Sequence, residues 1–367
     1  MPIAPFKHNF FPRPRCQMHA CLLRTVVELT GEAVITAMAV WNNRLYFATQ
    51  NPLYAVAGNR PPRIYVYDPA LGTTTAVALP GAFVSNTNTS ITGMVVYNDQ
   101  LWIVSGASAT AADNGQIFAL STVGVWTAAA ALGFPGWTGG TVANMLPTMF
   151  LFGTQIIIAG TGGAGTLRFH FYNGLAWVEE NTAFAATVVT TRDQVVTVNG
   201  TLYFGIQGGG NASIQFRTPA AVYGQQYTYP INNPPMALAA MNNQLWAGQF
   251  IGAGGLAGTL LRALPMTVPA DMLLRVTTGV TYLTPISSGT PLTATDGQVM
   301  LMAALGGLFL LERDGSLRVL VLQDNDVFMP FIKTVNRVHY VAQCSLPTAG
   351  PATLASPQVT SRISLLE

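Results

Sequence analysis

Side chains that could carry acid–base chemistry are scarce in this chain. Of its 367 residues, four are histidines and 15 are Asp or Glu. Two of the histidines, His170 and His339, fall in apolar stretches far apart in the sequence, and nothing requires them to meet. No Gly-x-Ser-x-Gly segment offers a serine nucleophile. We therefore expect no catalytic residue and predict that the protein is not an enzyme.

Residues of metal-ligating type gather near the N-terminus. His8, Cys16, His19 and Cys21 lie close together, and both residue types bind zinc. The two cysteines have a histidine between them, however, and no second pair follows, so the spacing matches no zinc-finger pattern. Three cysteines are also an odd number, which implies no disulfide framework. We expect no metal and no cofactor.

Carboxylates offer one further metal candidate. Asp324-Asn325-Asp326 could supply oxygen ligands, but a calcium loop needs more ligands at fixed spacing and none follows. Whether Asp324 and Asp326 bind calcium stays open. Glu179 and Glu180 follow an expected strand, and we interpret them as a solvated corner. A glycosidase would need two facing carboxylates, which the sequence neither supplies clearly nor excludes.

The elements that must position these residues follow from a repeat. An alternating apolar stretch, a tight turn and a second apolar stretch recur seven times. Most copies have Asn, Asp or Gly in the turn, the residues that tolerate the positive φ of a two-residue hairpin. The second turn residue is expected at Asn43, Asp99, Thr154, Gly200, Asn243, Gly297 and Asn336. In the last copy this alignment places Arg337 in the next, polar column and Val338 in the aliphatic column after it.

The spacing of the repeats predicts the architecture. Turns recur about every 49 residues, a period that suits four-stranded blades of a β-propeller. Third strands are expected at 63–68, 116–120, 166–171, 213–216, 259–262 and 307–311. The last repeat ends with a third strand at 361–366, and residues 22–29 could supply its missing fourth strand. We predict an all-β, seven-bladed β-propeller closed by this N-terminal strand (21–367, one domain), preceded by an extended arm (1–20).

Several glycine pairs and aromatic residues carry a resemblance to a known family. Gly pairs follow the second strand at 162–163, 208–209, 254–255 and 306–307. Tyr172 and Trp177 form a Tyr-x4-Trp element in the third repeat. The chain resembles degenerate kelch-like propeller repeats, which implies the propeller fold and says little about function.

The connections at the two ends of the expected strands differ in length. Turns from first to second strands are short, whereas the segments 50–62, 106–114, 250–257 and 344–360 are long and rich in small residues. Binding residues concentrate in such loops. We predict a binding face that contains Tyr54, Arg60, Asn114, Trp137 and Phe250, residue types suited to contact with a protein or a glycan. The alternative is that each aromatic residue packs under its own loop.

The arm and the low charge point to a large assembly. Only 9% of the residues are charged, while free soluble proteins carry a well-charged surface. The arm holds Phe6, Phe10, Phe11 and Arg13 among several prolines, so we expect it to dock on another subunit. Nucleic acid is not an expected partner, because no basic cluster exceeds Arg13 and Arg15. No apolar run reaches the ~20 residues of a transmembrane helix, and the N-terminus shows no signal peptide.

These expectations combine into a functional hypothesis. We predict a non-enzymatic structural or binding propeller of a bacteriophage virion, in the tail or on the capsid exterior, that acts in assembly or host attachment. It would be made in the host cytoplasm, contact other virion subunits through the arm, and meet a host receptor or glycan through its loops. The alternatives are a cytoplasmic kelch-like scaffold or carbohydrate-binding propeller of a bacterial complex and, third, a propeller hydrolase.

Overall fold

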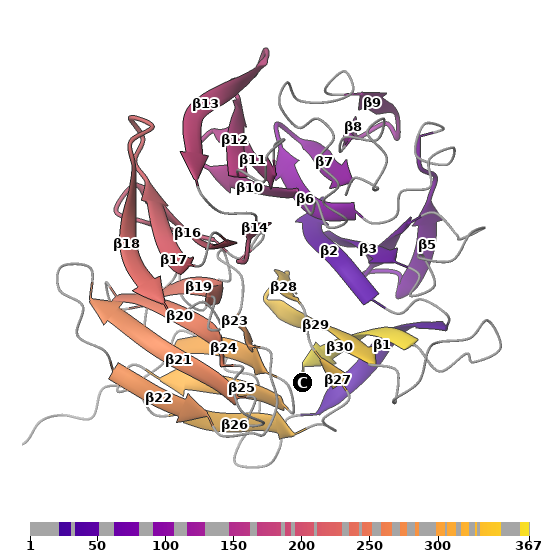
Figure 1. Cartoon of the computed structure of the whole chain (residues 1–367). Helices are drawn as coiled ribbons and strands as arrows, with labels where there is room; N and C mark the ends of the chain where they lie inside the picture. The colour runs from indigo at the N-terminus through magenta and orange to yellow at the C-terminus, as the bar shows by residue number, and fades with distance from the viewer. Residues whose placement is uncertain are drawn as a thin grey trace, which may run out of the picture.

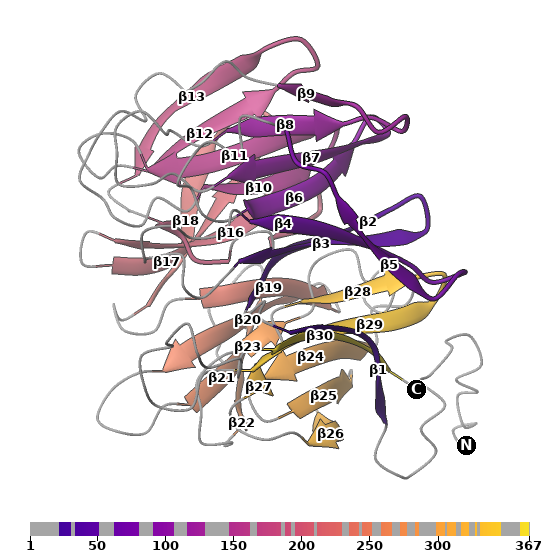
Figure 2. The same ribbon diagram turned by 90° about the vertical axis from the view of Figure 1, so that its right-hand side faces the viewer.

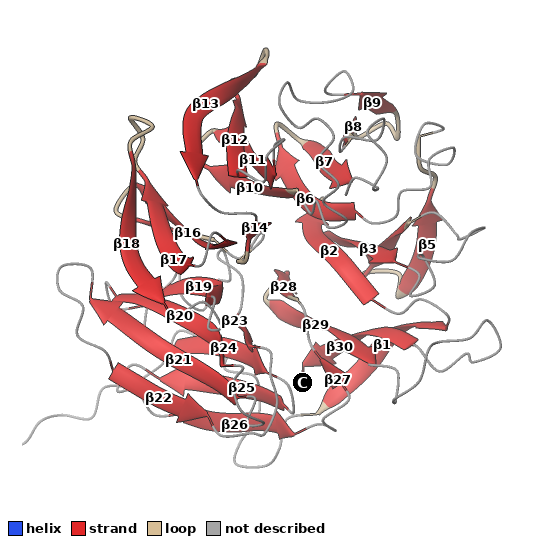
Figure 3. Cartoon of the chain, viewed as in Figure 1, coloured by secondary structure: helices blue, strands red, loops and turns tan. Residues whose placement is uncertain are grey.

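The structure is a computed structural model that describes strands and turns between residues 22 and 366. It leaves out 1–21, 31–33, 51–61, 81–90, 106–115, 129–146, 162–166, 185–187, 192–194, 209–210, 230–234, 242–243, 252–257, 266–271, 277–282, 286–298, 305–306, 313–316, 323–326, 329–330, 346–359 and 367. For most of 248–318 it describes the backbone alone. The regular elements among the described residues are all β-strands (Figure 3).

The described strands form seven antiparallel sheets, numbered here in chain order. Sheet 1 holds β2 (Val34–Trp41), β3 (Arg44–Gln50), β4 (Arg63–Asp68) and β5 (Thr73–Val77). Sheet 2 holds β6 (Ile91–Tyr97), β7 (Gln100–Ser105), β8 (Ile117–Leu120) and β9 (Trp126–Ala128). Sheet 3 holds β10 (Thr148–Phe152), β11 (Gln155–Thr161), β12 (Leu167–Tyr172) and β13 (Trp177–Phe184). Sheet 4 holds β14 (Val188–Val189) and β15 (Val196–Val198), which both pair with β16 (Thr201–Gly208), then β17 (Asn211–Arg217) and β18 (Tyr223–Tyr229).

The remaining sheets complete the series. Sheet 5 holds β19 (Pro235–Met241), β20 (Gln244–Ile251), β21 (Gly258–Pro265) and β22 (Met272–Val276). Sheet 6 holds β23 (Leu283–Pro285), β24 (Val299–Ala304), β25 (Gly307–Glu312) and β26 (Leu317–Leu322). Sheet 7 holds β27 (Val327–Phe328) and β28 (Ile332–Val335), which both pair with β29 (Val338–Ser345), then β30 (Thr360–Leu366) and β1 (Leu23–Thr30). The first strand of the described chain thus pairs with its last, from Leu23 opposite Leu366 to Thr30 opposite Thr360.

The sheets stand around a common centre, with strands such as β2, β6, β19 and β28 towards it (Figure 1). The inner strand β6 packs against both β2 and β10, and β19 packs against β16 and β23. On its other side β2 packs against β28 and β29 of sheet 7. The side view shows the same sheets stacked face to face (Figure 2). Successive repeats therefore cover each other's apolar surfaces.

The core lies between neighbouring sheets. In β3, Leu45 and Phe47 belong to a buried cluster shared with sheet 7, whereas Tyr46 and Ala48 belong to one shared with sheet 2. Successive side chains of a strand point to opposite faces, so both faces of β3 are buried. Strands buried on both faces need continuous rather than alternating apolar sequence. This explains why the second strand of each repeat is so uniformly apolar.

The predicted two-residue turns are present wherever the described residues include them. Asn42 and Asn43 have φ of 50° and 58°, and Asn199 and Gly200 have φ of 48° and 75°. In sheet 3 the positive φ falls on Gly153, one residue earlier than the column of turn residues predicted.

The last repeat needs a correction of one residue. Its turn consists of Asn336 and Arg337, with φ of 49° and 67°, so Arg337 is not in the strand. An arginine rarely adopts positive φ, which is why the sequence pattern placed it after the turn. His339, rather than Val338, consequently occupies the aliphatic column of Leu45. A one-residue shift exchanges the two faces of a strand, so the corrected alignment also exchanges the faces of β29 relative to the other second strands.

The boundaries of other predictions can be compared directly. The third strand expected at 63–68 has those bounds in the structure. Phe250 lies inside β20, so the connection assigned to 250–257 begins only after Ile251. The predicted arm lies outside the described residues, and the division into arm and single domain stays a prediction. No helix of the described residues could cross a membrane.

Candidate functional site

The sheets have two different ends. We call the end with the turns 42–43, 98–99, 153–154, 199–200 and 336–337 the turn face, and the opposite end the loop face. Because the strands are antiparallel, the turns between third and fourth strands also belong to the turn face. The long connections, such as 51–62 and 346–359, join strand ends at the loop face.

Most of the predicted site residues cannot be placed. Tyr54, Arg60, Asn114 and Trp137 of the predicted binding face lie outside the described residues, as do Phe6, Phe10, Phe11 and Arg13 of the arm and Asp324 and Asp326. Phe250 is placed by its backbone alone, opposite Thr259 at the loop-face end of β20.

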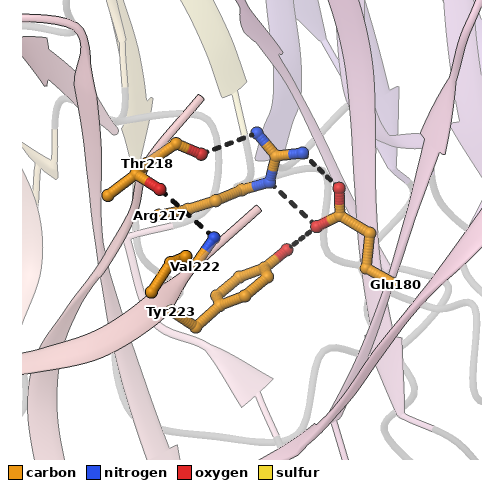
Figure 4. Close-up of polar contacts among 5 residues, drawn as sticks. All are labelled: Glu180, Arg217, Thr218, Val222 and Tyr223. Carbon is orange, nitrogen blue, oxygen red and sulfur yellow. Dashed lines mark hydrogen bonds and ion pairs between the residues drawn. The ribbon is translucent and has the colours of Figure 1, made fainter. Parts of the chain in front are cut away.

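The described residues contain one buried ionic cluster, between sheets 3 and 4 (Figure 4). The guanidinium of Arg217, at the end of β17, donates from Nε to Glu180 Oε2 over 2.8 Å and from Nη2 to Glu180 Oε1. The Tyr223 hydroxyl, at the start of β18, donates to Glu180 Oε2 as well. Glu180 and Arg217 are 7% and 2% exposed, so the ion pair is almost fully removed from water.

The surroundings of this cluster are aromatic. The Arg217 guanidinium carbon lies 5.2 Å from the centre of the Phe152 ring. The Tyr223 ring lies 5.4 Å from Phe169 and 5.5 Å from Phe184, measured between ring centres. In these apolar surroundings an unpaired charge would be strongly destabilising, so the Arg217 and Glu180 charges each require the other.

The electrostatics follow from burial and pairing. Burial alone would lower the pKa of Arg217, but its hydrogen bonds to the Glu180 carboxylate and the carboxylate charge raise that pKa above its ordinary value. Burial first, and then the hydrogen bond to Glu180, raise the pKa of Tyr223 far above its ordinary value. Both side chains therefore keep their protons at any physiological pH. The cluster joins sheets 3 and 4 through a buried ion pair.

This cluster corrects the interpretation of Glu179 and Glu180 as a solvated corner. Both lie within β13, where successive side chains point to opposite faces. Glu179 accepts a 2.6 Å bond from Arg168 Nη1 and is about one-third exposed, whereas Glu180 is buried against Arg217. The usable signal was Arg217, the one charged residue of β17, a strand in which Ile214 and Phe216 alternate with polar residues, because a buried arginine needs an acid.

The two described histidines are far apart in the fold. His170 lies in β12 of sheet 3 and His339 in β29 of sheet 7, as expected from the sequence. Both are buried, and burial is the main reason that the pKa of each is lowered. His170 Nε2 lies 4.0 Å from Glu179 Oε2, and His339 Nδ1 lies 2.9 Å from Thr334 Oγ1. Neither is placed to reach a substrate at the surface.

The buried thiol of Cys344 is similarly enclosed. It accepts a hydrogen bond from the backbone N–H of Ile35 over 3.2 Å, and burial raises its pKa to about 12. Such a thiol is a packing group rather than a nucleophile. Within the described residues, no group of three or more His, Cys, Asp or Glu side chains could hold a metal ion.

Comparisons with known proteins identify the fold. No family model matches the chain, and no curated protein matches its sequence. Among solved structures, a catalytically inactive virginiamycin B lyase from Staphylococcus aureus, determined with quinupristin, is 11% identical with a TM-score of 0.61, covering 94% of this chain and all of that one. The polysaccharide lyase Uly1 is 9% identical with a TM-score of 0.56, covering 90% of this chain and 89% of its own. The Dos1 propeller is 10% identical with a TM-score of 0.57, covering 91% and 78%.

These neighbours confirm one prediction and correct another. The chain is an all-β protein with a β-propeller fold, as the repeats predicted. The prediction that it is not an enzyme is contradicted, because two of these neighbours are lyases. That prediction equated few titratable residues with no activity, although one fold carries many functions and a site needs only a few side chains. The kelch-like identity and the virion role stay predictions.

Proposed function

We propose that the seven sheets are the seven blades of a ring closed by β1. The pairing of β1 with β30 supports this, because it completes the last sheet with a strand from the other end of the chain. The contacts of β2 with both β6 and β28 support it further, since they join the first sheet to the second and to the last. A closed ring leaves only short sheet edges exposed.

We infer that the loop face of this ring binds the ligand of the protein. The observation that carries this proposal is the difference between the two ends. Five of the six connections longer than ten residues between the described strands join strand ends at the loop face, and the sixth, 286–298, links β23 to β24 at the turn face. In sheets 1 to 4 the turn-face connections are two-residue hairpins and short hydrogen-bonded turns. Long connections on a rigid scaffold are where binding residues concentrate. The residues proposed to contribute are Tyr54, Arg60, Asn114, Trp137 and Phe250.

The setting we propose is a bacteriophage virion, with the protein in the tail or on the capsid exterior. The low proportion of charged residues supports this, since a chain in which only 9% of the residues are charged suits a protein surrounded by other subunits. The ligand would then be a protein or glycan of the host surface. A kelch-like scaffold or carbohydrate-binding propeller of a bacterial complex would use the same face.

The test combines binding with stability. The purified protein is applied to an array of bacterial surface glycans and to host-cell envelopes, beside Trp137→Ala. We expect the variant to bind more weakly by about 1–2 kcal/mol or more, with an unchanged melting temperature. Val319→Ala, an exposed change in β26, is the matched control. A lower melting temperature with unchanged binding would show that Trp137 packs under its loop, and the proposal would fail.

A second candidate function is lyase activity, favoured by the fold neighbours that cover nearly the whole chain. The chain would cleave its ligand by elimination, which creates a new carbon–carbon double bond. Incubation with quinupristin and with acidic polysaccharides, followed by ultraviolet absorbance and mass spectrometry, would detect that bond. New ultraviolet absorbance from the double bond, with polysaccharide fragments whose masses add up to that of the substrate or with a ring-opened isomer of quinupristin, would establish the activity. Unchanged substrates throughout would remove this candidate.

A further inference from the structure

Exposed aliphatic side chains recur at the outer turns of four successive sheets. Leu71, in the β4–β5 turn, is 71% exposed, and Val123, in the β8–β9 turn, is 82% exposed. Leu175, in the β12–β13 turn, is 93% exposed, and Val222, in the β17–β18 turn, is 57% exposed. One such residue on the surface is ordinary, but the same feature at the same place in four repeats is not.

The four turns are built alike, which makes these tips rigid. Each begins with a residue whose side chain accepts hydrogen bonds from backbone N–H groups further along the turn. Asp68 accepts from Ala70, Ser121 from Val125, Asn173 from Leu175 and Ala176, and Thr218 from Val222. A turn held by its own side chain presents its tip in one conformation, so little entropy is lost when a partner binds there.

The tips share one end of the molecule. Contacts join the turn-face ends of neighbouring sheets. Trp41 Nε1 donates to Asp99 Oδ1 over 3.1 Å between sheets 1 and 2, and the Tyr97 and Tyr172 rings lie 6.2 Å apart between sheets 2 and 3. Arg217 lies over Phe152 between sheets 3 and 4. Figure 2 shows the β4–β5 and β8–β9 turns together on the right-hand side.

The chain also enters the fold on this face. β29 begins at the turn-face turn 336–337, so β30 ends there and β1, paired antiparallel with β30, begins there. Leu22, directly before β1, is 71% exposed. We call Leu22, Leu71, Val123, Leu175 and Val222 the turn-face rim. The segment 1–21 therefore joins the molecule at the rim.

The composition of segment 1–21 matches the rim. It contains Ile3, Phe6, Phe10 and Phe11 among prolines at 2, 5, 12 and 14, and it has no acidic residue. Proline-rich chain favours the extended polyproline conformation of about 3.1 Å per residue, in which sixteen residues would span about 50 Å. A segment of that length can cross several tips and offer an aromatic ring at each.

The direction of β1 decides which molecule supplies the segment. β1 begins at the turn face and runs towards the loop face. A segment before residue 22 that extended the axis of β1 backwards would therefore lead away from the rim of its own molecule. Residues 15–22, Arg-Cys-Gln-Met-His-Ala-Cys-Leu, contain none of the Gly, Pro, Asn, Asp or Ser residues that favour chain reversal. We propose that the turn-face rim is the docking surface for segment 1–21 of a second copy of this chain.

Self-association of the full chain tests the proposal. In sedimentation velocity, Leu71→Ser, Val123→Ser, Leu175→Ser and Val222→Ser combined should weaken association about tenfold or more, because exposed apolar anchors are lost. Leu151→Ser with Val319→Ser, two exposed aliphatic residues off the rim, is the matched control and should associate like the wild type. The rim variant, the control variant and the wild type should have the same melting temperature, since every changed side chain is exposed. A rim variant that associates like the wild type, or a wild type that stays monomeric, would overturn the proposal.

A cross-linking experiment establishes which copy supplies the segment. A photo-reactive benzophenone amino acid replaces Phe10 in the full chain, and isotopically heavy and light copies are mixed before irradiation. We expect cross-links from position 10 of one copy to the rim turns of the other, in peptides of mixed isotope. Links confined to one copy, or to segments of the loop face, would refute the proposal. Loop-face binding is not involved in either readout, so the two proposals can fail separately.

Discussion

Arg217 occupies a position at which sheets 1, 2 and 3 have an aromatic or aliphatic residue. The residue before the outer turn is Tyr67 in sheet 1, Leu120 in sheet 2 and Tyr172 in sheet 3. In sheet 4 an arginine stands there, and the bonds to the Glu180 carboxylate of the preceding sheet supply the opposite charge that compensates its burial. A buried ion pair stabilises little over an apolar pair, but one partner without the other is strongly destabilising.

We predict that Arg217→Met alone lowers the free energy of unfolding by about 3–5 kcal/mol, because Glu180 is left charged and buried. Urea unfolding followed by circular dichroism would measure the loss. Adding Glu180→Leu should recover most of it, since two apolar residues then meet between the sheets. Arg44→Met, which breaks the exposed pair with Asp68, is the control and should cost about 1 kcal/mol or less. A single Arg217→Met variant as stable as the wild type would contradict this account.

His339 predicts a pH dependence of stability. Burial lowers its pKa below the unfolded value of 6.5, so the unfolded chain binds the proton more readily than the folded one. Stability from this residue is therefore present above about pH 6.5 and is lost as the pH falls towards the folded pKa. His339→Leu puts a leucine at this position, as at the equivalent positions Leu45 and Leu101 in the first two repeats. Urea unfolding at pH values above and below 6.5 should show a shallower loss for the variant than for the wild type, and equal slopes would refute the prediction.

Among the elements, the inner strands β6 and β10 approach each other closely at Gly93. The pairing of the inner with the second strand shifts register between Ile35 and Ala37 in sheet 1 and between Ile91 and Gly93 in sheet 2. A Cβ added at Gly93 would lie 2.8 Å from the backbone nitrogen of Met149 in β10. The backbone of β10 cannot retreat without moving its sheet, so glycine is required at this crossing.

We predict that Gly93→Ala lowers the free energy of unfolding by about 1–3 kcal/mol through overpacking. Within a strand, alanine is otherwise more stable than glycine. A lower free energy of unfolding would therefore show that the added methyl group collides with β10. Ala37→Gly, at the equivalent place in sheet 1, is the control and should cost about 0.5–1 kcal/mol. Chemical unfolding of both variants decides the matter. A Gly93→Ala variant more stable than the wild type would mean that β6 and β10 lie further apart.

For the whole molecule, the joint between the two ends of the chain is the decisive feature. β1 is held by its ladder with β30, by the buried Val27 side chain and by an exposed pair in which Arg362 Nε donates to Glu28 over 3.1 Å. The exposed ion pair contributes little, so the ladder and Val27 dominate. Without β1, β30 becomes an open sheet edge.

We predict that deleting residues 1–30 lowers the free energy of unfolding by about 2–3 kcal/mol from the burial of Val27 alone. The open edge of β30 should also promote association through strand pairing. Deleting residues 1–21 leaves β1 in place and is the control for stability. Calorimetry and light scattering would compare the two truncations. If both unfold alike, the ring does not depend on β1, and the proposed closure would have to be given up.

The sequence by itself determined the elements. Asn42-Asn43 and Asn199-Gly200 mark tight turns because these residues adopt positive φ at low cost, and that property is local. The apolar stretches on either side of each turn indicated strands, and the period of the repeats indicated a propeller. Each of these signals lies within a few residues or repeats at a fixed interval, so it could be found without knowing which segments meet.

Only the tertiary structure decided which side chains meet. Glu180 and Glu179 are neighbours in the sequence, yet one is buried against Arg217 and the other faces water, because β13 presents them to opposite sides. Arg337 belongs to a turn because the pairing of β28 with β29 sets the register, against its own backbone preference. The rim exists because four separate turns end at one face. Contacts between residues far apart in the chain depend on register and on packing between sheets, and no local pattern encodes either.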